Sequence, residues 1–132
     1  MAKLMPVLLL AVGGAAGTLA RVGLAALVQK AHGGPWPWGT LVVNALGCLL
    51  FGTLWGVFNL RLPHVSPLWS LALLGGFCGA FTTFSTFAFE THRLSGDAPA
   101  AHALGYLLLS NVAGLALVWV GAEHLARLWL PR

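Results

Sequence analysis

The sequence predicts an all-α membrane protein with four transmembrane helices. Hydrophobic residues make up 58% of the 132 residues and charged residues only 8%, whereas a soluble domain carries about a quarter of charged residues. Four stretches without Asp, Glu, Lys or Arg follow one another along the chain, and each can hold one span. A soluble catalytic domain is therefore excluded, and we expect residues 1–132 to form a single domain in a lipid bilayer.

Turn-forming residues separate the four stretches. They are His32-Gly33-Gly34-Pro35, Arg61-Leu62-Pro63-His64 and Ser95-Gly96-Asp97-Ala98-Pro99. We therefore expect helices at about 4–29, 38–60, 67–92 and 100–128. The six tryptophans lie mostly toward the ends of these helices, as expected for aromatic belts at the two membrane interfaces.

The first expected helix has two interpretations. Met-Ala-Lys, an apolar run to Val12 and small residues to Ala20 also fit a signal peptide cleaved near Ala20. Small residues spaced by four favour a permanent helix, because they let helices approach closely. The pairs with this spacing are Gly13 and Gly17, Ala16 and Ala20, Gly52 and Gly56, Gly75 and Gly79, and Ser110 and Gly114. We expect a compact bundle that associates with further copies of itself.

Basic residues are divided almost evenly between the two membrane faces. With four spans, one face holds Lys3, Arg61, Arg127 and Arg132, and the other holds Lys30, Arg93 and Arg21. Since Lys and Arg near span ends set the orientation, this balance permits insertion both ways and an antiparallel, dual-topology homodimer. A single orientation fixed by one weak charge agrees equally well with the count.

The third expected helix has a polar centre. Residues 75–87 combine three glycines with four hydroxyl side chains, which a regular lipid-facing helix would lack. Glycine permits conformations that release carbonyls from the helix, and such backbone is tolerated at membrane depth only inside protein or along a site. We predict a break in the middle of this helix, with carbonyls suited to a hard cation such as sodium. The alternative to an ion site is that these hydroxyls merely bond to backbone carbonyls of the preceding helical turn.

Aromatic and amide groups near this centre suit an anion. Phe81, Phe84 and Phe87 recur every three residues, so we expect them along one helix face, and the positive edge of a phenyl ring can face an anion. Asn44 could add an amide donor or merely bond a neighbouring helix. Arg21 lies within the first span, where an arginine is a candidate functional residue. The alternative is that its side chain extends to the membrane interface. Without a carboxylate in mid-membrane, passive anion passage is favoured over coupled cation export.

Residues 76–87, Gly-Phe-Cys-Gly-Ala-Phe-Thr-Thr-Phe-Ser-Thr-Phe, closely resemble the signature of the Fluc (CrcB) family of fluoride channels. Two further motifs, at 13–21 and 39–47, match in order and spacing, so the resemblance covers essentially the whole chain. It implies a fluoride-selective passive channel, not an enzyme, through which cytoplasmic fluoride leaves the cell across the plasma (inner) membrane. It also implies an antiparallel homodimer with two pores and a central structural sodium ion.

The resemblance also assigns residues to the permeation path. Phenylalanine edges, one asparagine amide and hydroxyl donors would line the pore, with an arginine in the vestibule. The residues so assigned are Asn44, Phe84, Phe87, Ser110, Thr86, Thr40, Tyr106, Arg21 and Glu90. Gly79 and Thr82 would offer backbone carbonyls to the sodium ion. Gly114 departs from the pattern, because some family members carry another hydroxyl at this position.

Other functions fit less well. A small multidrug transporter would need a carboxylate in the first span, and residues 4–29 contain none. A structural membrane subunit would explain the glycines but not the hydroxyls and phenylalanines gathered around one break. An intramembrane enzyme would need a histidine or carboxylate near Ser85 and Thr86. The scattered basic residues do not favour nucleic acid, and no other protein partner is indicated.

Overall fold

A computed structural model describes residues 4–61, 66–97 and 99–128. Within these ranges every regular element is a helix, and four stretches are long and apolar enough to cross a membrane: Leu4–His32, Trp38–Asn59, Pro67–Asp97 and Ala100–Leu128. The prediction of an all-α protein with four membrane-competent helices is therefore confirmed. Lys3, Pro63, His64 and Arg132, which entered the turn and charge predictions, lie outside the described residues.

The four stretches contain several helical elements. The first is α1 (Leu4–His32), and the second is α2 (Trp38–Gly56) with the π-helical η1 (Val57–Arg61). The third consists of α3 (Pro67–Ser70), η2 (Leu71–Cys78), α4 (Gly79–Phe81) and α5 (Phe84–Asp97). The fourth consists of α6 (Ala100–Val120), η3 (Gly121–Leu125) and α7 (Ala126–Leu128).

The end of the third stretch differs from the prediction. Helix α5 continues to Asp97, so Ser95, Gly96 and Asp97 belong to the helix and not to the expected turn. Ser95 Oγ donates to His92 O at 2.6 Å, which keeps this hydroxyl satisfied within the last turn. The reversal instead coincides with Pro99, which precedes α6 with an extended ψ of 139° and has no N–H to continue a helix.

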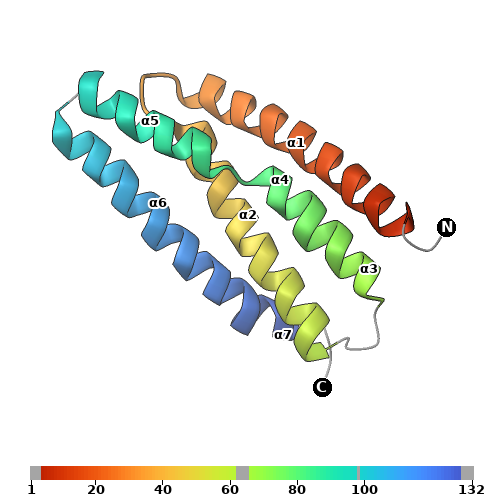
Figure 1. Ribbon diagram of the computed structural model, residues 1–132. Helices are drawn as coiled ribbons and strands as arrows, with labels where there is room; N and C mark the ends of the chain where they lie inside the picture. Colours follow the sequence, from red (N-terminus) through yellow and green to blue (C-terminus); the bar gives the residue numbers. More distant parts are fainter. Residues whose placement is uncertain (1–3, 62–65, 98, 129–132) are drawn as a thin grey trace.

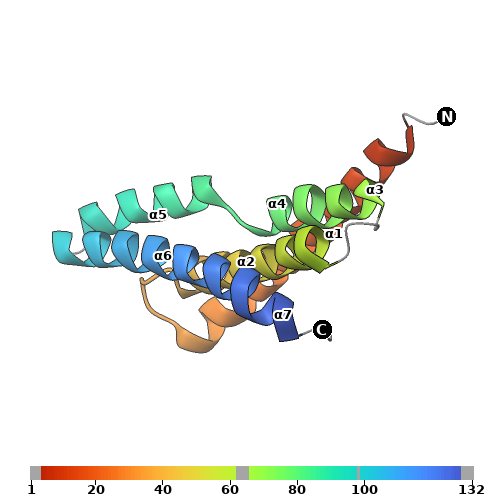
Figure 2. The ribbon, with the colours of Figure 1, turned by 90° about the horizontal axis from the view of Figure 1, so that it is seen from below.

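Helix α2 occupies the middle of the bundle (Figure 1). It packs mainly against α6 and η3, while α1 packs against η2 and α4, and α5 packs against α6. Seen from below, α5 and α6 run side by side, and the chain between α4 and α5 leaves the helical path (Figure 2). The two halves of the third stretch thus have different partners, which places their junction beside α2.

Glycines allow α1 to contact the third stretch through its backbone. A Cβ atom at Gly13 would overlap Ala72 O, one at Gly17 would overlap Phe77 O, and one at Gly76 would lie 2.9 Å from Leu10 O. Gly52 similarly meets the backbone of α6 at Val118. Gly79 is different, because only Leu74 O, at 3.8 Å, lies near its missing side chain. Within one subunit, therefore, no other helix approaches closely at Gly79 among the described residues.

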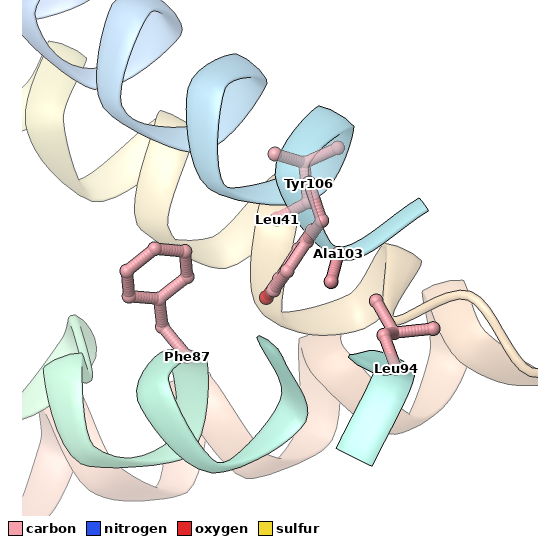
Figure 3. Packing of buried hydrophobic residues seen from close by; sticks show 5 residues of the cluster. All are labelled: Leu41, Phe87, Leu94, Ala103 and Tyr106. Atoms are coloured by element: carbon pink, nitrogen blue, oxygen red, sulfur yellow. The ribbon is translucent and has the colours of Figure 1, made fainter. Parts of the chain in front are cut away.

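The largest cluster of buried apolar side chains lies where α2, α5 and α6 meet (Figure 3). It contains Leu41, Phe87, Leu94, Ala103 and Tyr106, with Trp36 and Trp38 packed against it. Many other large apolar residues, including most leucines of α6, face outward. This exposure is expected for a chain surrounded by lipid, where close packing and not the exclusion of water drives the association of helices.

We predict that Gly17→Ala destabilises the bundle by about 1 to 3 kcal/mol, because the new methyl group forces α1 away from the backbone of Phe77. The matched variant Gly23→Ala lies on the same helix with no atom within 4 Å of its Cβ position. It should be neutral or stabilising by up to about 1 kcal/mol. Thermal unfolding in detergent measures both, and equal midpoints would contradict the packing described here.

Candidate functional site

The third stretch stops being helical at Thr82 and Thr83. Helix α4 ends at Phe81, Thr82 has extended dihedral angles of −89° and 157°, and α5 begins at Phe84. The amide and the hydroxyl of Thr82 both donate to Cys78 O, at 3.1 Å each. Helical hydrogen bonding to Cys78 O therefore reaches Thr82, and the regular hydrogen bonding between α4 and α5 is lost after it.

Asn44, on α2, binds both backbone groups of Thr83. Its Oδ1 accepts from Thr83 N at 2.8 Å, and its Nδ2 donates to Thr83 O at 3.1 Å. A buried backbone group without a hydrogen-bond partner is costly. The two bonds to Asn44 replace the helical hydrogen bonds that the backbone of Thr83 lacks. An amide is required for this pairing, because it alone offers a donor and an acceptor side by side. One Nδ2 hydrogen remains for another acceptor.

Thr83 also caps α5 with its side chain. Its Oγ1 accepts from Thr86 N at 3.3 Å and donates to Thr86 Oγ1 at 2.9 Å. This is the usual bond between an N-cap hydroxyl and the third helical amide. Thr83 was not among the predicted site residues. A hydroxyl residue three positions before another hydroxyl, ahead of an amphipathic helix, was the signal that could have identified it.

Carbonyls are released on the α4 side of the junction. Ala80 O accepts from Arg21 Nε at 3.2 Å, so this half-buried arginine is bonded to the backbone of the third stretch. Gly79 O loses its normal helical donor, because the amide of Thr83 is bound to Asn44. The Gly79 carbonyl oxygen is therefore without its helical partner beside the junction. No group of three or more His, Cys, Asp and Glu able to hold a metal exists in the described part of the chain.

A groove of about 310 Å³ opens on one side of the junction. Asn44, Thr82, Phe84 and Ser110 contribute to its walls. The Phe84 side chain is 78% exposed, whereas Ser110 Oγ is buried and has no hydrogen-bond partner among the described residues. Four predicted pore residues line this groove, which Gly114 and Cys48 continue: Asn44 on α2, Phe84 and Phe87 on α5, and Ser110 on α6.

A larger cavity of about 610 Å³ lies on the other side of the junction. Arg21, Thr40, Thr86 and Glu90 line it, and Thr83 lines both this cavity and the groove. The cavity therefore collects the predicted permeation residues that the groove does not, apart from the buried Tyr106. Gly79, predicted as a sodium ligand, lines neither space. Thr83 is the residue of the junction that borders both spaces, and Thr86, one turn into α5, borders the cavity.

The Glu90 carboxylate is held by two hydroxyls. Thr40 Oγ1 donates to Glu90 Oε1 and Tyr106 OH donates to Glu90 Oε2, both at 2.9 Å. Tyr106 is fully buried, with its ring 5.3 Å from that of Phe87, and its hydroxyl points between α5 and α6 in Figure 3. Charge-assisted bonds of this kind are strong, so the carboxylate is fixed beside the cavity.

The predicted stripe of three phenylalanines is wrong for Phe81. The chain leaves the helix between Phe81 and Phe84, so Phe81 stacks on Phe77 at 5.6 Å and stays buried. Phe84 and Phe87 do share a face, with ring centroids 5.8 Å apart. Only these two rings border the groove.

Comparisons with known proteins agree on one family. Residues 8–122 match the family described as CrcB-like protein, Camphor Resistance (CrcB). A fluoride-specific ion channel FluC from Nitratidesulfovibrio vulgaris (strain Miyazaki F) is 52% identical over 87% of this chain and 92% of its own length. Proteins of the same name from Nitrosococcus oceani and Leptospira interrogans are 46% and 40% identical, over 85% and 86% of this chain and 89% of each relative.

We predict that Thr83→Ala lowers the free energy of unfolding by about 1 kcal/mol, because α5 loses its cap. Thr83→Ser keeps the hydroxyl and should remain close to wild type. Chemical or thermal unfolding of the purified protein measures the difference. If Thr83→Ala and Thr83→Ser were equally stable, the side chain would not cap α5.

Proposed function

The chain belongs to the CrcB-like family, and on that premise we propose that it is a fluoride-selective passive channel. The family consists of ion channels, not enzymes. Four apolar helices mark the chain as an integral membrane protein, which we place in the plasma membrane. Passive flow would let fluoride leave a cytoplasm in which it has accumulated.

The observation that carries this proposal is the arrangement of uncharged donors along the groove. Asn44 keeps one amide hydrogen free after binding Thr83, and Phe84 presents a ring at the groove. Ser110 adds a hydroxyl without a partner. Fluoride is strongly hydrated, so a path must supply donors in place of its water, yet bind weakly enough for release. Amide, hydroxyl and ring-edge donors without full charge suit this requirement.

The cavity would supply fluoride to this path. Arg21 lines it, and a cation in a cleft raises the local concentration of anions. Thr86 lines the cavity next to Thr83, which borders both spaces. Thr86 accepts from Thr83 Oγ1, so its own hydroxyl proton is free for an anion. Thr40 and Tyr106 both donate to Glu90. An ion near them would therefore compete with this carboxylate for their protons.

A second copy of the chain would complete the path. Phe84 is 78% exposed and the groove is open along the subunit surface, so one subunit alone does not enclose an ion. The balanced basic residues of the two faces permit the second copy to insert in the opposite orientation. We propose an antiparallel homodimer with two pores.

The same dimer would hold a structural sodium ion. Hard cations bind oxygen ligands, and the carbonyl of Gly79 loses its helical donor to Asn44 while Thr82 lies outside both helices. The carbonyl oxygens of these two residues suit a sodium ion, but two carbonyls from one subunit leave its coordination shell incomplete. Their equivalents in a second, antiparallel copy would add the missing ligands.

The direct test is ion efflux from liposomes containing the purified protein, with potassium and valinomycin to dissipate the potential. We expect rapid fluoride loss and no chloride loss, and weaker fluoride loss for Phe84→Ile, because the ring edge is removed. Absence of fluoride flux from a folded wild-type protein would contradict the proposal. Equal chloride flux would contradict the selectivity.

Asn44→Asp should reduce fluoride flux more than about a hundredfold, because a carboxylate within reach of the path repels the anion. The acceptor for Thr83 N remains, but the donor to Thr83 O is lost. The same efflux assay measures the effect, with Asn59→Asp as a control because that amide bonds to Trp55 O of its own helix and lines neither the groove nor the cavity. Wild-type flux from Asn44→Asp would exclude Asn44 from the path.

A further inference from the structure

Gln29 connects the end of α1 to the loop before α2. Its Nε2 donates to Gly34 O at 3.1 Å and to Trp36 O at 3.0 Å, and its Oε1 accepts from Gly39 N at 3.2 Å. Both amide hydrogens and the carbonyl oxygen are thus bound to backbone groups. A side chain with three such bonds, half-buried at the cavity wall, fixes the loop in one position.

The loop needs an external support of this kind. Gly33 and Gly34 have positive φ angles of 63° and 72°, and no atom lies within 4 Å of their Cβ positions. Pro37, the residue before α2, provides no side-chain cap. The first amides of a helix lack partners inside the helix. Gln29 therefore supplies, from ten residues earlier, the cap that α2 lacks.

Two structural routes lead from Gln29 to the Glu90 carboxylate. The first is the capped turn of α2, where Thr40 follows Gly39 directly and donates to Glu90 Oε1. The second is Trp36, whose ring meets that of Tyr106 edge to face with centroids 5.5 Å apart, and Tyr106 donates to Glu90 Oε2. Both hydroxyls that hold the carboxylate therefore depend on a segment that Gln29 fixes.

We propose that Gln29 is a positioning residue of the ion path, which sets the location of Glu90 through Thr40 and Tyr106. The inference rests on the proposed channel function, because Gln29 acts on ion flow and not on folding alone. Loss of its three bonds leaves Glu90 with a less defined position at the cavity. Fluoride flux should fall roughly tenfold or more, as expected when a distant substitution displaces a functional group.

The test compares Gln29→Met with wild type in the fluoride efflux assay. Methionine keeps the length and volume of the side chain but makes none of the three hydrogen bonds. Gln29→Glu retains only the acceptor for Gly39 N and should be impaired as well. Asn59→Leu is the matched control, because that amide bonds only to Trp55 O of its own helix, and its flux should equal that of wild type.

A second measurement separates positioning from general destabilisation. Tyr106→Phe removes the hydroxyl bond to Glu90, so Gln29→Met should reduce flux much less in the Tyr106→Phe background than in wild type. The effects of two substitutions within one hydrogen-bond network are not additive. Undiminished flux in Gln29→Met, or independent effects of the two substitutions, would overturn the inference while leaving the channel function intact. A wild-type protein without fluoride flux would overturn both.

Discussion

The two hydrogen bonds between Asn44 and Thr83 are the interaction on which the rest of the site depends. A helix interrupted inside a membrane exposes backbone groups that lipid cannot satisfy, at a cost of several kcal/mol for each group. One amide side chain removes this cost for both groups of Thr83. Because Thr83 then caps α5, the same contact defines where α5 begins and which way Phe84 and Phe87 face.

Most of the remaining polar side chains near the junction bind backbone groups, and few are free to bind an ion. Gln29 binds the loop before α2, Arg21 binds Ala80 O, and Thr82 binds Cys78 O. These bonds stabilise irregular backbone near the junction and the cavity. Few donors are left over, notably one hydrogen of Asn44 and the hydroxyl of Ser110. A path with few, weakly polar donors is consistent with an ion that must bind and leave quickly.

Composition and local spacing were sufficient to predict the helices and to single out Asn44, because polar groups within apolar stretches are rare and stand out. The assignment of Phe84, Phe87 and Ser110 to the permeation path came from the resemblance to the CrcB family. Composition and spacing failed at Phe81, since periodicity assumes that one helix continues through the interruption. They also missed Thr83 and Gln29, whose roles arise from contacts with Asn44 and with the loop of residues 33–37. No sequence pattern reveals which distant backbone group a buried amide binds.

Amide hydrogen exchange around the junction tests the central role of Asn44 most directly. Thr83 N is bound to Asn44, whereas the amides of Phe84 and Ser85 begin a helix and have no acceptor in the preceding helix. We expect Thr83 to exchange slowly beside two rapidly exchanging neighbours, and to exchange as rapidly as they do in Asn44→Ala. Rapid exchange of Thr83 in the wild-type protein, or no change in the variant, would contradict the account.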